Sequence, residues 1–125
     1  MIKVLLVDDK YEIRKLLTLA FQHRRDYAIS EAADGTEAMK SIARSRPDLV
    51  ILDIMMPGSI DGLDVLDAIR SNPEFAGMKV FMLSARTQKS DQKIAMEKGA
   101  DAYFAKPFSI VELINVIDHN FQSQG

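Results

Sequence analysis

The sequence predicts an α/β fold, a doubly wound (βα)5 sandwich in which helices cover both faces of a parallel sheet of five strands. Three observations predict it: apolar runs of strand length recur at nearly even spacing, segments of helical period lie between them, and the clearest runs lack polar alternation. Strictly alternating strands and helices require right-handed crossovers and therefore parallel strands. The continuous apolar runs at residues 4–7 and 49–52 are typical of strands buried on both faces.

The expected strands are read directly from the apolar runs. They are Ile2–Val7, Tyr27–Ala32, Leu49–Leu52, Lys79–Leu83 and Ala100–Ala105. Between the first two runs, apolar residues follow the i, i+3, i+4, i+7, i+8 spacing of a helix with one buried face. The residues expected to face inward are Ile13, Leu16, Leu17, Ala20 and Phe21. The chain therefore begins with a strand, a helix and a second strand.

Later helices are recognised by their ends. Asp34 followed by Glu37, and Ser109 followed by Glu112, match the capping-box pattern of a helix start. These pairs predict the beginnings of the second and the last helix. Gly99 predicts the end of the fourth helix, because glycine commonly terminates helices.

Length and composition indicate one domain, which we place at residues 1–122, followed by a short polar tail at 123–125. Apolar residues make up 47% of the chain and charged residues 27%, as in an ordinary soluble protein with a sizeable core. The net charge of −2 offers no basic field, so direct nucleic-acid binding is not expected. The lack of cysteine and of any apolar run near 18 residues favours the cytoplasm and argues against a membrane partner.

Polar residues follow four of the five expected strands. Asp8 and Asp9 come after the first, Asp53 after the third, Ser84 after the fourth and Lys106 after the fifth. In an open parallel sheet, the functional crevice lies beyond the carboxyl ends of the strands. We therefore expect three carboxylates, a hydroxyl and an ammonium group to converge at one edge.

This combination of groups favours phosphoryl chemistry. Three clustered carboxylates repel one another, and a bound divalent cation relieves the repulsion. Oxygen ligands favour Mg²⁺, with Mn²⁺ as an alternative. Lys106 and Ser84 suit the oxygens of a phosphoryl group, and Asp53, central among the strand ends, is a candidate nucleophile.

Each residue taken alone also has a structural interpretation. Asp9 followed by Glu12 can cap a helix, and Asp53 can be an ordinary turn residue. A single Lys106 is usually solvated, and Ser84 by itself carries little signal. The methionines, including Met55 and Met56, are interpreted as filling the core or its rim. Only the joint placement at successive strand ends favours a functional site.

These residues, in this order, closely resemble the receiver domain of two-component response regulators over essentially the entire chain. The matching stretches are residues 4–9 (VLLVDD), 47–57 (PDLVILDIMMP), 61–62 (DG), 84–85 (SA), 99–103 (GADAY) and 106–108 (KPF). The resemblance to the chemotaxis receiver implies a flavodoxin-like sheet with strand order 2-1-3-4-5. The starting Met1 favours a single-domain protein, although a receiver cut from a longer regulator would look the same.

The resemblance also implies a role for each site residue. Asp53 would be the phosphoacceptor, Asp9 a direct Mg²⁺ ligand and Asp8 a ligand acting mainly through metal-bound water. The backbone carbonyl of Met55 would complete the protein ligands. Lys106 would pair with the phosphoryl group.

Three further positions follow from the same resemblance. The bond between Lys106 and Pro107 would be cis, a form almost confined to X-Pro bonds. Ser84 would move to bind a phosphoryl oxygen, and Tyr103 would be an aromatic switch that rotates on the outer face. Catalysis would therefore rest on Asp53, Lys106 and Ser84, and switching on Ser84 and Tyr103.

Two features depart from the family pattern. The stretch Gly58-Ser59-Ile60 makes the loop before Asp61 one residue longer than usual. Position 55 is Met and position 86 is Arg, and in this family both positions tune the rate of dephosphorylation.

The expected function is that of a switch without independent substrate turnover. A histidine kinase or phosphotransfer protein would supply the phosphoryl group, and the surface of helix four, strand five and helix five would control a downstream protein or form a dimer. The fourth helix, near Gln88 to Lys98, offers mainly Ile94 and Ala95 as an inward stripe. It is expected to be weakly anchored, and weakly packed elements are the ones that move.

Two other classes of protein share part of this residue pattern. A haloacid-dehalogenase-like phosphatase also uses an aspartate and Mg²⁺, but it places a second aspartate two residues later, where this chain has Met55. A flavodoxin would bind the FMN phosphate after the first strand, where Asp8 and Asp9 would repel it. Both readings are therefore disfavoured.

Overall fold

The structure is a computed structural model that describes residues 1–85 and 89–121. Strands and helices alternate along the chain as predicted. The strands are β1 (Ile2–Val7), β2 (Tyr27–Ala32), β3 (Leu49–Asp53), β4 (Lys79–Ser84) and β5 (Ala102–Ala105). The helices are α1 (Tyr11–Ala20), α2 (Gly35–Ser45), α3 (Gly62–Ser71), α4 (Lys89–Glu97) and α5 (Ile110–Phe121), with a short 3-10 helix at Pro73–Phe75.

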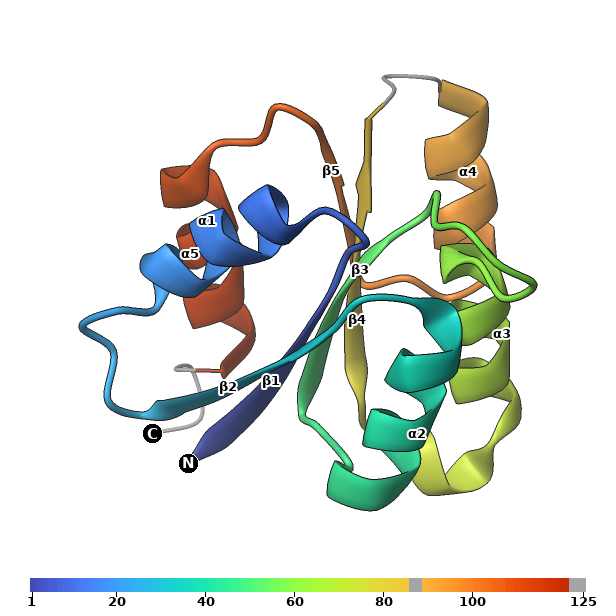
Figure 1. Cartoon of the computed structure of the whole chain (residues 1–125), viewed down its shortest axis with the longest axis horizontal. Helices are drawn as coiled ribbons and strands as arrows, with labels where there is room; N and C mark the ends of the chain where they lie inside the picture. Colours follow the sequence, from blue (N-terminus) through green and yellow to red (C-terminus); the bar gives the residue numbers. More distant parts are fainter. Residues whose placement is uncertain (86–88, 122–125) are drawn as a thin grey trace.

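The five strands form one parallel sheet in the order β2-β1-β3-β4-β5, which confirms the predicted flavodoxin-like topology. Helices α1 and α5 cover one face of the sheet, and α2, α3 and α4 cover the other (Figure 1). The register pairs Val7 of β1 with Leu52 of β3, so these two strands end beside each other. Residues that follow them therefore meet at one edge of the sheet.

The core consists of two apolar layers, one on each face of the sheet. Successive strand residues alternate between them, so that Val4 packs under α1 and α5 whereas Leu5 packs under α2 and α3. All five residues of β3 are buried, including Asp53. Burial on both faces explains why the strand sequence is continuously apolar.

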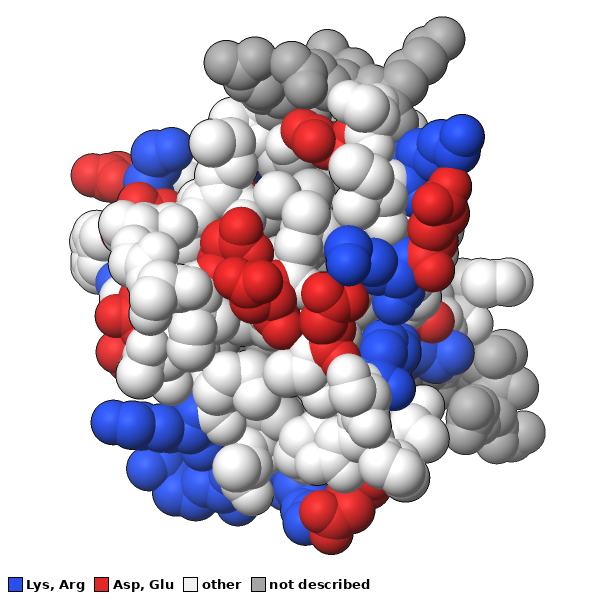
Figure 2. Space-filling model, turned by 90° about the vertical axis from the view of Figure 1, so that its right-hand side faces the viewer, with Lys and Arg blue, Asp and Glu red and all other residues white. Residues whose placement is uncertain are grey.

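The face formed by α2, α3 and α4 carries both acidic and basic side chains, and neither kind covers it (Figure 2). Among the described residues, no helix is long and apolar enough to cross a bilayer.

Helix ends follow the predicted caps. The Asp34 carboxylate accepts a hydrogen bond from the Glu37 N–H at 2.8 Å, and the Ser109 hydroxyl accepts one from the Glu112 N–H at 3.1 Å. Gly99 has a φ of 102° after the last turn of α4, which confirms it as a helix terminator.

Strand limits differ slightly from the prediction. β3 and β4 each run one residue further, to Asp53 and Ser84, because the ladder continues onto these polar residues. The fifth strand begins at Ala102 and not at Ala100. The Ala100 N–H donates to the carbonyl of Ala95 and so belongs to the end of α4.

Two predicted inward positions are wrong. Leu16 is 42% exposed and Ile94 is 39% exposed. α1 packs through Leu17 and its neighbours on one side, which leaves Leu16 at the border of the buried face. In α4, Ala95 is buried and Ile94 lies beside it at the solvent edge. The predicted start of that helix at Gln88, and the tail at 123–125, lie outside the described residues.

Candidate functional site

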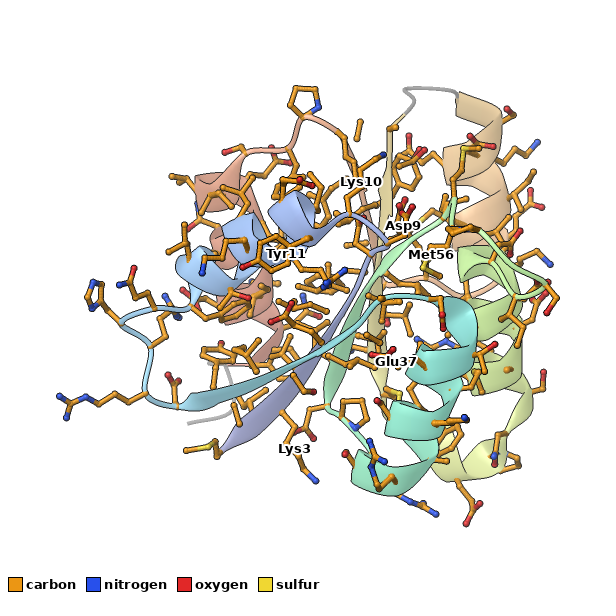
Figure 3. All side chains as sticks on the ribbon, viewed as in Figure 1. Lys3, Asp9, Lys10, Tyr11, Glu37 and Met56 are labelled. Carbon is orange, nitrogen blue, oxygen red and sulfur yellow. The ribbon has the colours of Figure 1, made fainter. Side chains whose placement is uncertain are left out.

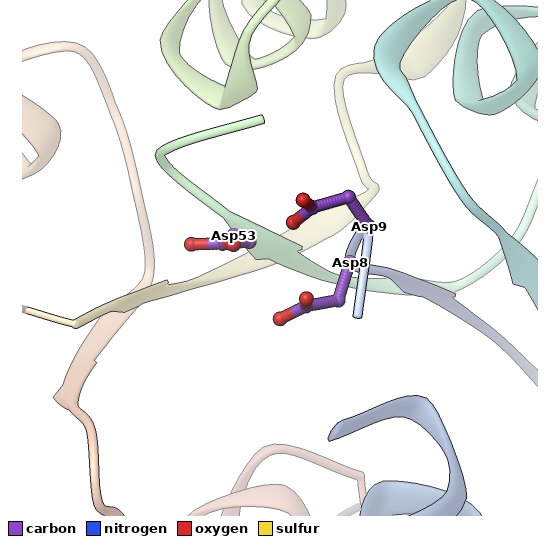
Figure 4. A group of neighbouring side chains, drawn as sticks. All are labelled: Asp8, Asp9 and Asp53. Carbon is purple, nitrogen blue, oxygen red and sulfur yellow. The ribbon is translucent and has the colours of Figure 1, made fainter. Parts of the chain in front are cut away.

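Three carboxylates gather at the carboxyl ends of β1 and β3, as the sequence predicted. Ligand oxygens of Asp8, Asp9 and Asp53 all lie within 4.8 Å of one another. The three side chains point into the same space (Figure 4). Asp8 and Asp53 are buried, whereas Asp9 is exposed. A set of oxygen donors without nitrogen or sulfur fits a hard divalent cation such as Mg²⁺.

The turn after β1 holds Asp8 in place. Its N–H donates to the carbonyl of Ala32 at 3.2 Å, and its carboxylate accepts from the N–H of Lys10 at 2.9 Å. Arg14 reaches back from α1 and donates to the Asp8 carbonyl at 2.7 Å, while its Nε bonds to Glu31 at 2.9 Å. Asp8 is therefore fixed through both its backbone and its side chain.

The capping interpretation of Asp9 is wrong. The N-cap of α1 is Lys10, whose side chain makes no capping hydrogen bond. The turn is closed instead by the bonds to Asp8, so the Asp9 side chain is not used in starting the helix. Asp9 projects towards the hollow beside Met56 at the end of the sheet (Figure 3).

Lys106 lies against the carboxylates and is not solvated. Its Nζ is 2.7 Å from Asp8 Oδ2 and 3.3 Å from Asp53 Oδ2, and its side chain is 10% exposed. The Lys106 N–H donates to the carbonyl of Ser84, and the peptide bond to Pro107 is cis, as the resemblance implied. β4 and β5 thus deliver Ser84 and Lys106 side by side.

Burial shifts the pKa of Asp53 upwards, and the neighbouring Asp8 charge adds to this, while Lys106 and the Met55 N–H offset part of the effect. For Lys106, burial would lower the pKa. The hydrogen bond to Asp8 and the charges of both carboxylates outweigh burial and raise it. With every group ionised, three carboxylates and one ammonium leave two negative charges uncompensated, which a divalent cation would neutralise.

Ser84 and Tyr103 occupy different depths. Ser84 is fully buried at the end of β4, opposite Ala105 in the register. Tyr103 is half-buried in β5 and packs against the apolar layer shared with α2, α3 and α4. The structure places one at the site and the other beside α4, and their switch roles stay predictions.

The loop between β3 and α3 forms one wall of the site. The Met55 N–H donates to Asp53 Oδ1 at 3.3 Å, and the Met55 side chain is 59% exposed. A hollow of about 410 Å³ lies between this loop and Asp9, lined by Asp9, Ile54, Met55, Met56, Pro57 and Asp61. Met56 is buried, in agreement with its interpretation as filler. Arg86 lies outside the described residues.

Sequence reasoning missed two supports of the site. Arg14 binds the Asp8 carbonyl, but an arginine on a helix carries no signal of that contact. Asp61 and Asp64 form a reciprocal capping box that starts α3. The S/T/D/N start pattern with an acidic residue three positions on could have revealed that pair.

Known proteins resemble this chain in both sequence and fold. A family model described as the response regulator receiver domain matches residues 4–118. The DNA-binding response regulator MtrA of Mycobacterium tuberculosis is 36% identical over 112 residues, which make up 90% of this chain and 47% of that protein. The response regulator MprA of a Mycobacterium species is 37% identical over 113 residues, with the same coverage. The chain thus spans about half the length of the curated relatives it matches.

Solved structures share the fold over nearly the whole chain. The receiver domain of the Francisella response regulator 1452 has a TM-score of 0.87 and 30% identity, with complete coverage of both chains. The chemotaxis protein CheY4 of Vibrio cholerae has a TM-score of 0.85 and 29% identity, covering 95% of this chain and 98% of that one. The DNA binding in the name of MtrA belongs to that protein. The expectation of no direct nucleic-acid binding for this chain stays a prediction.

Proposed function

Because the chain belongs to the family of response regulator receiver domains, we propose that it accepts a phosphoryl group on Asp53. The donor would be the phosphohistidine of a histidine kinase or of a phosphotransfer protein. The observation that carries the proposal is the placement of a buried Asp53 between two further carboxylates and the Lys106 ammonium. This arrangement supplies both a nucleophile and opposite charge for the oxygens of an incoming phosphoryl group.

The transfer is a displacement at phosphorus. A carboxylate oxygen of Asp53 forms the new O–P bond as the N–P bond to the donor histidine breaks, and the bonding pair leaves with the imidazole nitrogen. Lys106, already 3.3 Å from Asp53 Oδ2, stays within reach of the phosphoryl oxygens. Water later attacks the acyl phosphate, which releases inorganic phosphate and restores the carboxylate.

The cation proposed for the site is Mg²⁺, with Mn²⁺ as an alternative. Asp9, Asp53 and the backbone carbonyl of Met55 would hold it directly, and Asp8 would hold it through a bound water. When present, it supplies positive charge to the phosphoryl oxygens. The oxygen-only donor set and its excess negative charge support this assignment.

The domain is proposed to act as a switch and not as an independent enzyme. A phosphatase of the haloacid-dehalogenase type needs an acid two residues after the nucleophile, and Met55 supplies none. Hydrolysis of its own acyl phosphate would reset the switch without turnover of another substrate. Such a role fits the cytoplasm, where its phosphodonor kinases act.

The proposed output is a change of the surface formed by α4, β5 and α5. Ser84 would move to a phosphoryl oxygen, and Tyr103 would follow into the space beside α4. Two observations support this. Tyr103 is half-buried, and Ala95 is the buried side chain among those described in α4. The partner would be a downstream protein, or a second copy of the chain bound through the same surface.

The test is chemical labelling followed by intact-mass measurement. Incubation with acetyl phosphate or phosphoramidate and Mg²⁺ is expected to give one base-labile phosphate adduct on the wild type. Neither Asp53→Asn nor wild type in EDTA should gain it. Equal labelling of Asp53→Asn would sink the assignment.

A further inference from the structure

The first residue of α2 lies directly against the loop that follows the phosphoacceptor. Gly35 is buried, and a Cβ at this position would lie 2.3 Å from the carbonyl oxygen of Ile60 and 2.6 Å from its Cγ2. The nearest atom belongs to the backbone, so no side-chain rotation relieves the overlap. A close approach of this kind requires glycine.

The same loop is seated at its other end on a second glycine. A Cβ on Gly62 would lie 2.0 Å from the carbonyl oxygen of Asp53, and the Gly62 N–H donates to the carbonyl of Ile54 at 3.0 Å. Residues 54–61 therefore pack against Gly62 of α3 at the start of the loop and against Gly35 of α2 near its end. Met55, whose carbonyl is the proposed cation ligand, lies within this segment.

The α2 side of the contact leads back to Asp8. The Asp8 N–H donates to the carbonyl of Ala32 at the end of β2, three residues before Gly35. Asp34 between them caps α2 and fixes where the helix begins. Gly35 thus lies between the chain segment that holds Asp8 and the loop that carries Met55. A displacement of Ile60 from α2 would change the spacing between these two sides of the cation site.

We propose that the contact between Gly35 and Ile60 is a positioning contact for the cation site, with Gly35 a positioning residue that sets cation affinity. The inference rests on the proposed function. The Gly35 side of the contact leaves no free volume, so a methyl group added there must displace Ile60. The stretch Gly58-Ser59-Ile60 ends on this contact.

The test compares Mg²⁺ binding by titration calorimetry in the wild type, Gly35→Ala, Ile60→Ala and the control Gly77→Ala. Gly77 is exposed at the opposite end of the sheet and has no atom within 4 Å of a Cβ added there. Gly35→Ala should raise the Mg²⁺ dissociation constant about tenfold, the low end of the range seen when residues that position metal ligands are changed. Ile60→Ala should shift it in the same direction by less, and Gly77→Ala should leave it unchanged.

The second readout is the Mg²⁺ dependence of labelling by acetyl phosphate. Gly35→Ala should shift the half-saturating Mg²⁺ concentration while the rate at saturating Mg²⁺ stays close to that of the wild type. A merely structural glycine would lower the unfolding midpoint without moving the Mg²⁺ dependence, and that result would overturn the inference. Equal weakening in Gly77→Ala would do the same.

If Gly35→Ala does not fold, Ile60→Ala decides, and unchanged Mg²⁺ affinity in that variant overturns the inference. A wild type that binds Mg²⁺ and is labelled, beside unaffected variants, refutes the positioning role alone. A wild type that neither binds Mg²⁺ nor is labelled refutes the proposed function.

Discussion

Lys106 shows how one residue can serve stability and chemistry at the same place. Its ammonium joins Asp8 at 2.7 Å and Asp53 at 3.3 Å inside a largely buried site. Removing one partner of a buried ion pair leaves the other charge uncompensated, which costs about 3–5 kcal/mol. Without a cation, Lys106 is therefore the counter-charge that makes burial of two carboxylates tolerable.

Asp53→Asn is expected to stabilise the protein in EDTA by about 0.5–2 kcal/mol at neutral pH, the usual range for one stabilising substitution. Asp53 has its pKa raised in the folded state by burial and by Asp8, so the unfolded chain loses this proton first as the pH rises. Wild-type stability falls through that interval, and the asparagine variant escapes the loss. Below the ordinary pKa of 3.8 the two proteins should differ little.

Urea unfolding between about pH 4 and neutrality, in EDTA, measures this difference. Asp26→Asn is the control, because Asp26 is exposed and remote from the acidic cluster. A difference between wild type and Asp53→Asn that does not grow with pH would contradict the account of Asp53.

At the scale of elements, Arg70 of α3 holds the turn that follows α4. Arg70 of α3 donates to the carbonyls of Gly99 and Met78 and pairs with Asp101 at 2.8 Å. Asp101 also accepts the N–H of Val80, which ties the start of β5 to β4. The turn after α4 is thus fastened to the sheet, whereas Ala95 is the fully buried side chain among those described within the helix.

Arg70→Ala is expected to loosen α4 and to lower the free energy of unfolding by about 1–3 kcal/mol, since charge-assisted hydrogen bonds are lost. Amide exchange should accelerate in the last turn of α4 and at the start of β5, while α1 stays as protected as before. Arg44→Ala, an exposed arginine in the last turn of α2, is the matched control. Uniform acceleration across all helices would argue against a local clamp.

Local sequence patterns predicted where the strands lie and where several helices begin or end. They did not predict how wide the buried face of a helix is. The apolar runs located all five strands, and the caps at Asp34, Ser109 and Gly99 were confirmed. The prediction that Leu16 faces inward was wrong. Helical periodicity identifies the buried face of a helix but not its width, which depends on the rotation of the helix about its axis against the sheet.

The site was predictable as a convergence of strand ends, since parallel strands deliver their following residues to one edge. The residues that hold the site in place could not be predicted in this way. Arg14 reaches a backbone carbonyl, and Gly35 and Gly62 admit close backbone contacts. Each depends on a neighbour that only the folded chain brings near.

At the scale of the whole molecule, cation binding should register as global stability. Ligand that binds the folded state alone stabilises it, by about 2.7 kcal/mol at a hundredfold excess over the dissociation constant. Mg²⁺ is therefore expected to raise the thermal unfolding midpoint of the wild type relative to EDTA. In EDTA, Asp9→Asn should be at least as stable as the wild type, because the change removes one of three neighbouring negative charges and no helix cap, yet it should gain little from Mg²⁺.

Differential scanning calorimetry with and without Mg²⁺ provides the measurement. Glu97→Gln, which alters an exposed acid on α4, should retain the full gain. If Asp9→Asn responds to Mg²⁺ as strongly as the wild type, the cation does not bind at the cluster of Asp8, Asp9 and Asp53.

The hydrogen bond from the Lys106 N–H to the Ser84 carbonyl joins the residue that follows β5 to the last residue of β4. A phosphoryl group on Asp53 would be met by a hydroxyl and an ammonium whose backbones are already joined. The backbone bond would hold the hydroxyl and the ammonium at one spacing, so that both could contact the same phosphoryl group.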